Sequence, residues 1–231
     1  MLFASDLSTL MQPLMRMDIP ALPDTALRQI GVQMLWGTLL AAAGWRAGYR
    51  LPARWRAGFA ALIALCSVVP GPASPAYWLE MAFAAPSWTS ALLCGFYLQM
   101  QVRQTAGLRE DASGTAPAGI PWPWAAAGIA LGWVLALDTF ALLPLTDSLY
   151  GWGFTPLATL VLLLVAASAW LVKPDWATAL PMLAIALYVA TRLPSGNVWD
   201  AVTDPLLWLY LHGAVVLRVW RQLNGRRRRL T

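Results

Sequence analysis

The stretch WPWAAAGIALGWVLALDTFALLPLTD, residues 122–147, is a long apolar run that contains one internal carboxylate, Asp138. A run of about 20 apolar residues matches the thickness of a bilayer's hydrocarbon core, so the pattern predicts a transmembrane helix over residues 123–146. An ionisable group inside such a helix costs roughly 2.5–3.5 kcal/mol on insertion scales, and it usually faces a partner or water. Asp138 is therefore the first candidate for a functional residue.

The composition extends this prediction to the whole chain. Of 231 residues, 59% are hydrophobic and 12% are charged, whereas a soluble domain has roughly 25% charged residues. We therefore expect an all-α integral membrane protein, a bundle of about seven transmembrane helices in a membrane domain of residues 26–220. The other spans are expected over residues 26–44, 57–69, 86–102, 155–172, 177–193 and 205–220.

The segments outside these spans are predicted to lie at the membrane surfaces. Residues 1–25 have apolar residues at helical spacing, which predicts an extracytoplasmic amphipathic segment. Ser74 and Pro75 form a helix start, so a short interfacial helix is expected over residues 75–85; one kinked helix over residues 76–102 is the alternative. Residues 221–231 form a basic cytoplasmic tail.

Basic residues set the expected orientation, because Lys and Arg are retained on the cytoplasmic side of short loops. With the N-terminus outside and the C-terminus inside, 13 of the 16 Lys and Arg residues fall on the cytoplasmic side. This separation predicts a multi-pass protein of the bacterial cytoplasmic (inner) membrane. The two three-helix sets around residues 123–146 also leave open a 3+1+3 internal repeat.

A sparse set of polar residues forms the candidate intramembrane site: Asp138, His212, Arg192 and Glu80. Asp138 is expected about five residues before the outer end of its helix, roughly 8–10 Å deep at about 1.5 Å per residue. One hypothesis is that Asp138, with Arg192 or His212, lines an outward-facing polar cavity for a small solute or a proton. The alternative is a buried hydrogen-bonded pair that locks helices together. Glu80 either faces water or takes part in binding.

Cofactor chemistry finds little support in the sequence. His212 is the only histidine, which disfavours a bis-histidine haem or an ordinary zinc or copper site. Cys66 and Cys94 both lie inside apolar runs, and the only lysine, Lys173, lies in a turn. We therefore expect no metal and no cofactor. The run Arg226, Arg227, Arg228, Arg229 predicts contact with anionic lipid headgroups at the cytoplasmic face, and nucleic-acid binding is not expected.

These observations favour a non-catalytic accessory, anchoring or assembly subunit of a membrane complex, with protein partners. The alternative function is a small-solute transporter or channel with an outward-facing polar site around Asp138. Catalysis is not expected, because an intramembrane enzyme needs a cluster of His, Asp or Glu side chains at one depth.

Overall fold

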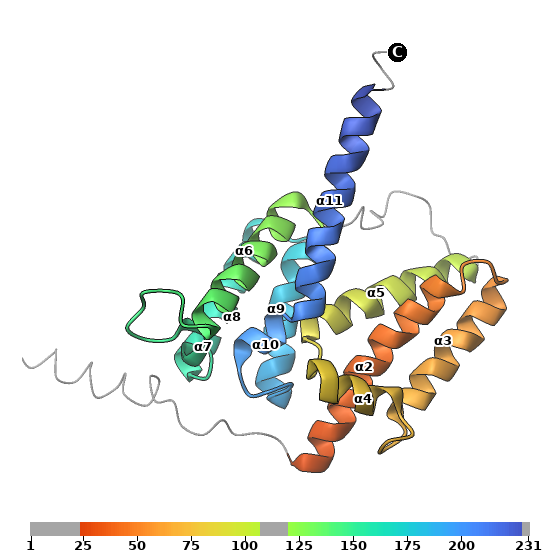
Figure 1. Cartoon of the computed structure of the whole chain (residues 1–231), viewed down its shortest axis with the longest axis horizontal. Coiled ribbons are helices and arrows are strands. Elements are labelled where there is room, and N and C mark those ends of the chain that lie inside the picture. The colour runs from red at the N-terminus through yellow and green to blue at the C-terminus, as the bar shows by residue number, and fades with distance from the viewer. Residues whose placement is uncertain (1–23, 107–119, 228–231) are drawn as a thin grey trace, which may run out of the picture.

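The computed structural model describes residues 24–106 and 120–227, and its regular structure there is entirely helical (Figure 1). Within these described residues the chain forms α2 (Thr25–Ala47), α3 (Ala53–Val68), α4 (Pro75–Phe83), α5 (Trp88–Thr105), α6 (Trp122–Thr139) and α7 (Leu149–Trp152). They are followed by α8 (Pro156–Val172), α9 (Trp176–Thr191), α10 (Val198–Val202) and α11 (Pro205–Arg227). The long helices lie where the sequence has its apolar segments.

Short polar side chains start most of these helices by accepting hydrogen bonds from free backbone N–H groups of the first turn. Ser74 accepts from Ala76 N, and Pro75 occupies the first turn of α4, as the sequence predicts. Thr155 caps α8 in the same way. Asp175 and Thr178 form a reciprocal capping box at the start of α9.

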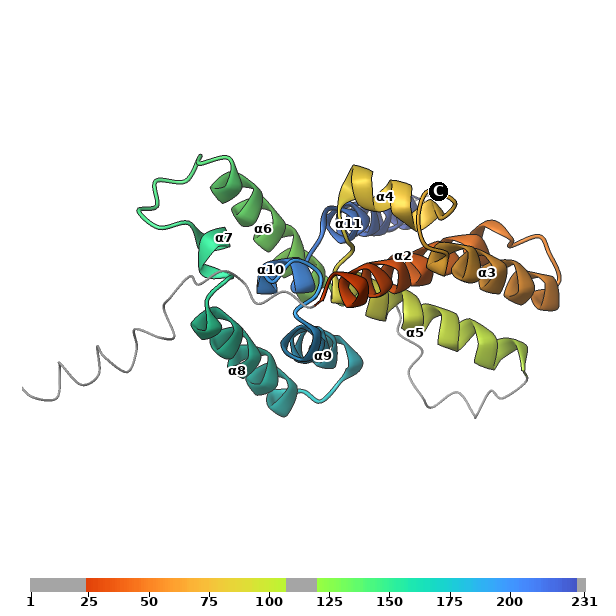
Figure 2. The same ribbon diagram turned by 90° about the horizontal axis from the view of Figure 1, so that it is seen from below.

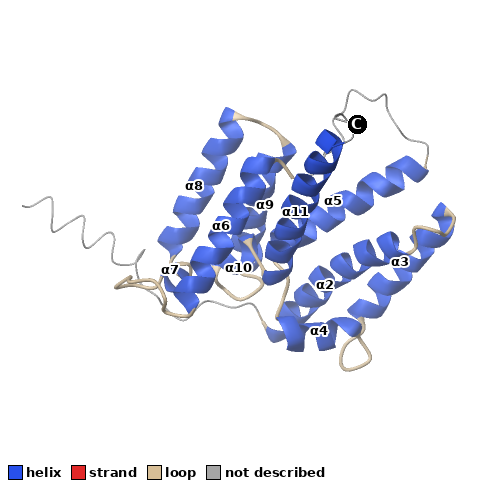
Figure 3. Cartoon of the chain, turned by 45° about the horizontal axis from the view of Figure 1, so that its top comes forward, coloured by secondary structure: helices blue, strands red, loops and turns tan. Residues whose placement is uncertain are grey.

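The helices form two groups that meet at α5. In the first group, α2 packs along α3, α4 and α5. In the second, α8 packs on α9, α11 packs on α6, and the short α7 and α10 fill the ends. Helix α5 contacts α9, α10 and α11, and so joins the groups. Figure 3 shows the helices fanned out side by side, with α8 at one edge and α3 at the other, and Figure 2 shows the two groups from below.

The buried apolar residues form several small clusters. The largest, built from α8, α9 and α10, contains Ala158, Ala166, Ile185, Tyr188, Val198 and Ala201. Smaller clusters join α2 to α4, α2 to α3, and α6 to α11. Of the 24 buried hydrophobic residues in the described segments, 11 are alanines. The helices therefore approach each other through small side chains, and many large apolar side chains point outward.

The predicted membrane-spanning architecture is wrong. No helix in the described part of the chain combines the length with the apolar character needed to cross a bilayer. Helix α8 has 17 residues, about 25 Å at about 1.5 Å per residue, which is shorter than a hydrocarbon core of about 30 Å. The longer α2 and α11 carry polar and basic residues such as Gln33 and Arg218. The predictions of seven transmembrane spans, of an N-out orientation and of an inner-membrane location depend on that architecture, and they are wrong as well.

The central apolar stretch shows why the prediction failed. We expected one helix over residues 123–146, but α6 ends at Thr139. The chain turns there because Ala141 adopts a positive φ of 54°, and Leu142 to Thr146 are not helical. An apolar run in the sequence was therefore longer than the helix it contains.

The expected segment boundaries differ in one further respect. Helix α11 continues to Arg227, so it includes most of the segment expected to be a basic tail from residue 221. The amphipathic segment expected over residues 1–25 lies almost wholly outside the described residues. The internal 3+1+3 repeat stays a prediction.

Candidate functional site

Asp138 ties the end of α6 to the start of α7. Its Oδ2 accepts a hydrogen bond from Ser148 Oγ at 2.9 Å and another from the backbone N–H of Tyr150 at 2.7 Å. Ser148 is itself the N-cap of α7, because its Oγ accepts from Gly151 N. The carboxylate is thus part of a local cap that closes the loop over residues 140–148.

The same contacts explain the charge state of Asp138. The backbone N–H of Tyr150 lowers the pKa of this carboxyl most, burial raises it, and the Ser148 hydroxyl lowers it further, with a net shift below the ordinary value. Asp138 is the second-last residue of α6, not five residues from the end of its helix as expected. The predicted position of Asp138, roughly 8–10 Å from the end of its helix at about 1.5 Å per residue, is therefore wrong.

The other residues of the predicted polar site have separate surroundings. Arg192 ends α9 in a left-handed conformation, with φ 57°, and its guanidinium lies over the Tyr188 ring at 5.6 Å from the centroid. His212 Nδ1 lies 2.8 Å from the carbonyl oxygen of Trp208 on its own helix. Glu80 is half-buried on α4. Neither Arg192 nor His212 provides a hydrogen bond to Asp138, so the structure does not assemble the expected group.

Asp204, which the sequence did not indicate as a site residue, joins two helices through buried hydrogen bonds. Its Oδ2 accepts from Ser87 N at 2.8 Å, from Ser87 Oγ at 2.6 Å and from Ser90 Oγ at 2.5 Å. Its Oδ1 accepts from Leu207 N at 2.8 Å. One carboxylate therefore caps α11 and holds the start of α5. The Asp-Pro pair before an apolar run signals the cap, but no sequence signal indicates the partner 117 residues away.

Asp200 is a second carboxylate that sequence analysis did not select. It accepts hydrogen bonds from Ser195 Oγ and from Tyr150 OH, the latter at 2.9 Å. Burial raises the pKa of Asp200; the Ser195 and Tyr150 hydroxyls oppose this, and the charge of Asp204 adds to it. Burial and the charge of Asp200 likewise raise the pKa of Tyr150. These contacts connect α7, α10 and the loop that follows α9.

The cysteines and the basic tail add no assembled group. Burial, helped by the charge of Asp204, raises the pKa of the Cys94 thiol to about 11, which disfavours the reactive thiolate. In the described segments, no three His, Cys, Asp or Glu side chains gather as a metal site would require. The side chains of Arg226, Arg227, Arg228 and Arg229 lie outside the described part. Their contact with anionic lipid headgroups stays a prediction.

An apolar face lies on the exposed side of α8. On α8, six large aliphatic side chains are between 37% and 87% exposed: Leu160, Val161, Leu164, Val165, Leu171 and Val172. Their spacing places them along one side of the helix, opposite the residues that pack on α9 and α10. We call this row the α8 outer face. It has no charged residue, and its one exposed polar residue is Ser168, which lies between Leu164 and Leu171.

Helix α3, which lies at the opposite edge of the molecule from α8, also exposes apolar side chains. Phe59, Leu62 and Leu65 are each more than 40% exposed. Exposed apolar patches of this kind mark interaction surfaces.

Comparison with protein-family models, with curated proteins and with solved structures found no match to this chain.

Proposed function

We propose that this chain is a non-catalytic accessory subunit that binds an apolar helix of a partner protein through the α8 outer face. The observation that carries the proposal is the row of six exposed aliphatic side chains along α8, interrupted only by the small polar residue Ser168. Full burial of each such side chain is worth about 1.5–3 kcal/mol. A partner that covers the row would therefore gain a large part of its binding free energy from this face.

The chemistry of the face favours a helix as its partner. Side chains at i, i+4 and i+11 or i+12 form a ridge, and a ridge on one helix packs into the groove of another. The face has no charge, and its one hydrogen-bonding side chain is the small Ser168, so a partner helix with an apolar stripe fits it. Helix α8 packs mainly on α9, and Figure 3 shows it at one edge of the row of helices.

The alternative function, a small-solute transporter or channel with a site around Asp138, lacks comparable support. That function needs a polar site open to solute, whereas the contacts of Asp138 are those of a loop and cap. We therefore do not propose it.

The proposal is tested by the mass and content of the native particle that contains the chain. We expect wild-type protein purified from its own cells to form a particle heavier than the 25.2 kDa chain, with one partner protein in a fixed ratio. Leu164→Glu places a charge in the α8 outer face and should release the partner. Leu142→Glu, at an exposed position in the loop after α6, is the matched control and should retain it. A wild-type particle of one chain, or a partner retained by Leu164→Glu, would refute the proposal.

A further inference from the structure

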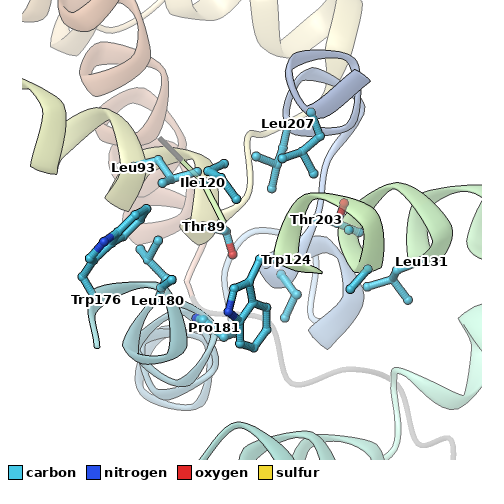
Figure 4. A pocket seen from close by; sticks show the side chains of 15 residues that line it. Thr89, Leu93, Ile120, Trp124, Leu131, Trp176, Leu180, Pro181, Thr203 and Leu207 are labelled. Atoms are coloured by element: carbon cyan, nitrogen blue, oxygen red, sulfur yellow. The ribbon is translucent and has the colours of Figure 1, made fainter. Parts of the chain in front are cut away.

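A cavity of about 170 Å³ lies where α5, α6, α9 and α11 converge. Each helix presents residues at helical spacing to it: Thr89 and Leu93 from α5, Leu207 and Leu211 from α11, and four residues each from α6 and α9. Figure 4 shows labelled side chains from these helices around a shared space. The cavity is separate from the α8 outer face, since no residue of α8 lines it.

The lining is almost entirely apolar. Apart from Gly128, the side chains are aliphatic or aromatic except for two threonines, Thr89 and Thr203, and no charged residue is present. The cavity is half-open, with Ala127 exposed at its edge, and because an ordered water needs two to four polar partners, the apolar walls favour an apolar occupant. An apolar protein cavity of about 150 Å³ can bind benzene. The volume here therefore suits a single ring with one small substituent.

Aromatic and proline side chains give the cavity flat surfaces. The indoles of Trp124 and Trp176 line it from α6 and α9, and Figure 4 shows Trp124 beside Pro181. Aromatic rings pair favourably in edge-to-face or offset arrangements, beyond the gain from area alone. The two indoles therefore favour an aromatic ring over a branched aliphatic molecule of equal volume.

Pro181 also adds a hydrogen-bond acceptor to this wall. It lies inside α9, and because proline has no N–H, the carbonyl of Ala177 four residues earlier lacks its normal intrahelical donor. Ala177 and Pro181 both line the cavity, so this carbonyl lies on the lining face of the helix. A ligand that carries one hydroxyl or N–H group can donate to it.

We propose that this cavity binds a small neutral aromatic molecule with one hydrogen-bond donor, whose ring lies among Trp124, Trp176 and Leu180 and whose donor bonds to the Ala177 carbonyl. The ligand class is that of simple phenols and related single-ring donors. The site is independent of the partner interface.

Two fluorinated probes test the proposal by ¹⁹F NMR on the full-length protein. We expect 4-fluorophenol to bind saturably and fluorobenzene, which has the same ring without the donor, to bind about tenfold more weakly. Pro181→Ala restores an N–H to α9 and pairs the Ala177 carbonyl. It should remove the preference for 4-fluorophenol while leaving the affinity for fluorobenzene unchanged. A preference that persists in Pro181→Ala would overturn the assignment of this carbonyl.

Cavity-filling variants separate this site from adsorption to exposed apolar faces. Ala127→Phe, at an exposed lining position of α6, should weaken 4-fluorophenol binding at least tenfold. Ala126→Phe, at an exposed position on the opposite side of α6, should not change it. Leu93→Trp fills the cavity from α5 and should act like Ala127→Phe. Both filling variants are compared only if their unfolding midpoints match wild type. The proposal would be overturned if 4-fluorophenol bound to wild type without saturation, or if both folded filling variants bound it as tightly as wild type.

Discussion

At the scale of single residues, two carboxylates organise the middle of the molecule, Asp204, which is buried, and Asp200, which is half-buried. Asp204 accepts four hydrogen bonds from donors at the starts of α5 and α11. Asp200 accepts from Tyr150 and Ser195 and so links α7 to α10. Both carboxylates have hydroxyl or N–H donors around them, and neither has a basic partner among the residues that the structure describes. They therefore stabilise the fold through the hydrogen bonds that they accept, four for Asp204 and two for Asp200, and not through ion pairs.

Removing the Asp204 carboxylate should destabilise the fold. Asp204→Ala leaves the buried N–H of Ser87 and the Leu207 N–H without their acceptor, and an unsatisfied buried donor costs about 1–3 kcal/mol. We expect the free energy of unfolding to fall by at least about 2 kcal/mol, as measured by denaturant titration. The control is Asp147→Ala, at an exposed position, which should change it by less than about 0.5 kcal/mol. Equal effects at the two positions would contradict the role given to Asp204.

Asp200 should make stability depend on pH. Because its pKa is raised in the folded protein, the folded state holds the proton more tightly than the unfolded state, whose Asp pKa is about 3.9. The resulting stabilisation is complete below that value and is lost as the pH rises through the raised pKa. The unfolding free energy of wild type minus that of Asp200→Asn should therefore fall as the pH is raised above about 4. A difference that stays constant from pH 3 to pH 7 would show that the pKa of the Asp200 carboxyl is not raised in the folded protein.

At the scale of elements, the sequence located the helices well and their ends less well. Apolar segments and cap residues such as Ser74 predicted the starts, because these signals are local. The end of α6 was missed since Leu142, Leu143 and Leu145 continue the apolar pattern after the backbone has turned at Ala141. Likewise, Asp138 was found as a candidate, but its donors Ser148 and Tyr150 depend on a loop conformation that periodicity does not encode.

The contact between α7 and the start of α10 depends on the absence of a side chain at Gly153. A Cβ there would lie 2.1 Å from Asn197 Oδ1 and 2.3 Å from Trp199 Cδ1, and both of these residues are buried. Gly153→Ala should therefore lower the free energy of unfolding by about 1–3 kcal/mol. Gly58, in α3, has no atom within 4 Å of such a Cβ, and Gly58→Ala should raise it by about 0.5–1 kcal/mol. Calorimetric melts of the two variants check the opposite signs.

At the scale of the whole molecule, the distribution of apolar residues is the dominant feature. In the described segments, 38 large apolar side chains are exposed, whereas 11 of the 24 buried hydrophobic residues are alanines. Composition predicted a protein rich in apolar contacts, but it assigned the outer ones to lipid across a bilayer. The helix lengths and their polar residues do not support spanning. We assign the α8 outer face to a protein partner instead.

Site-specific photo-cross-linking in the cells that produce the protein tests this assignment most directly. A photoreactive residue at Leu164 lies on the α8 outer face, and one at Leu162, which packs against the cluster of α8, α9 and α10, is the matched inward control. We predict that position 164 gives an adduct with one partner protein, mapped to a helix in that partner, and that position 162 gives cross-links within the chain alone. Adducts of position 164 with lipid alone, or with no protein at all, would contradict the account.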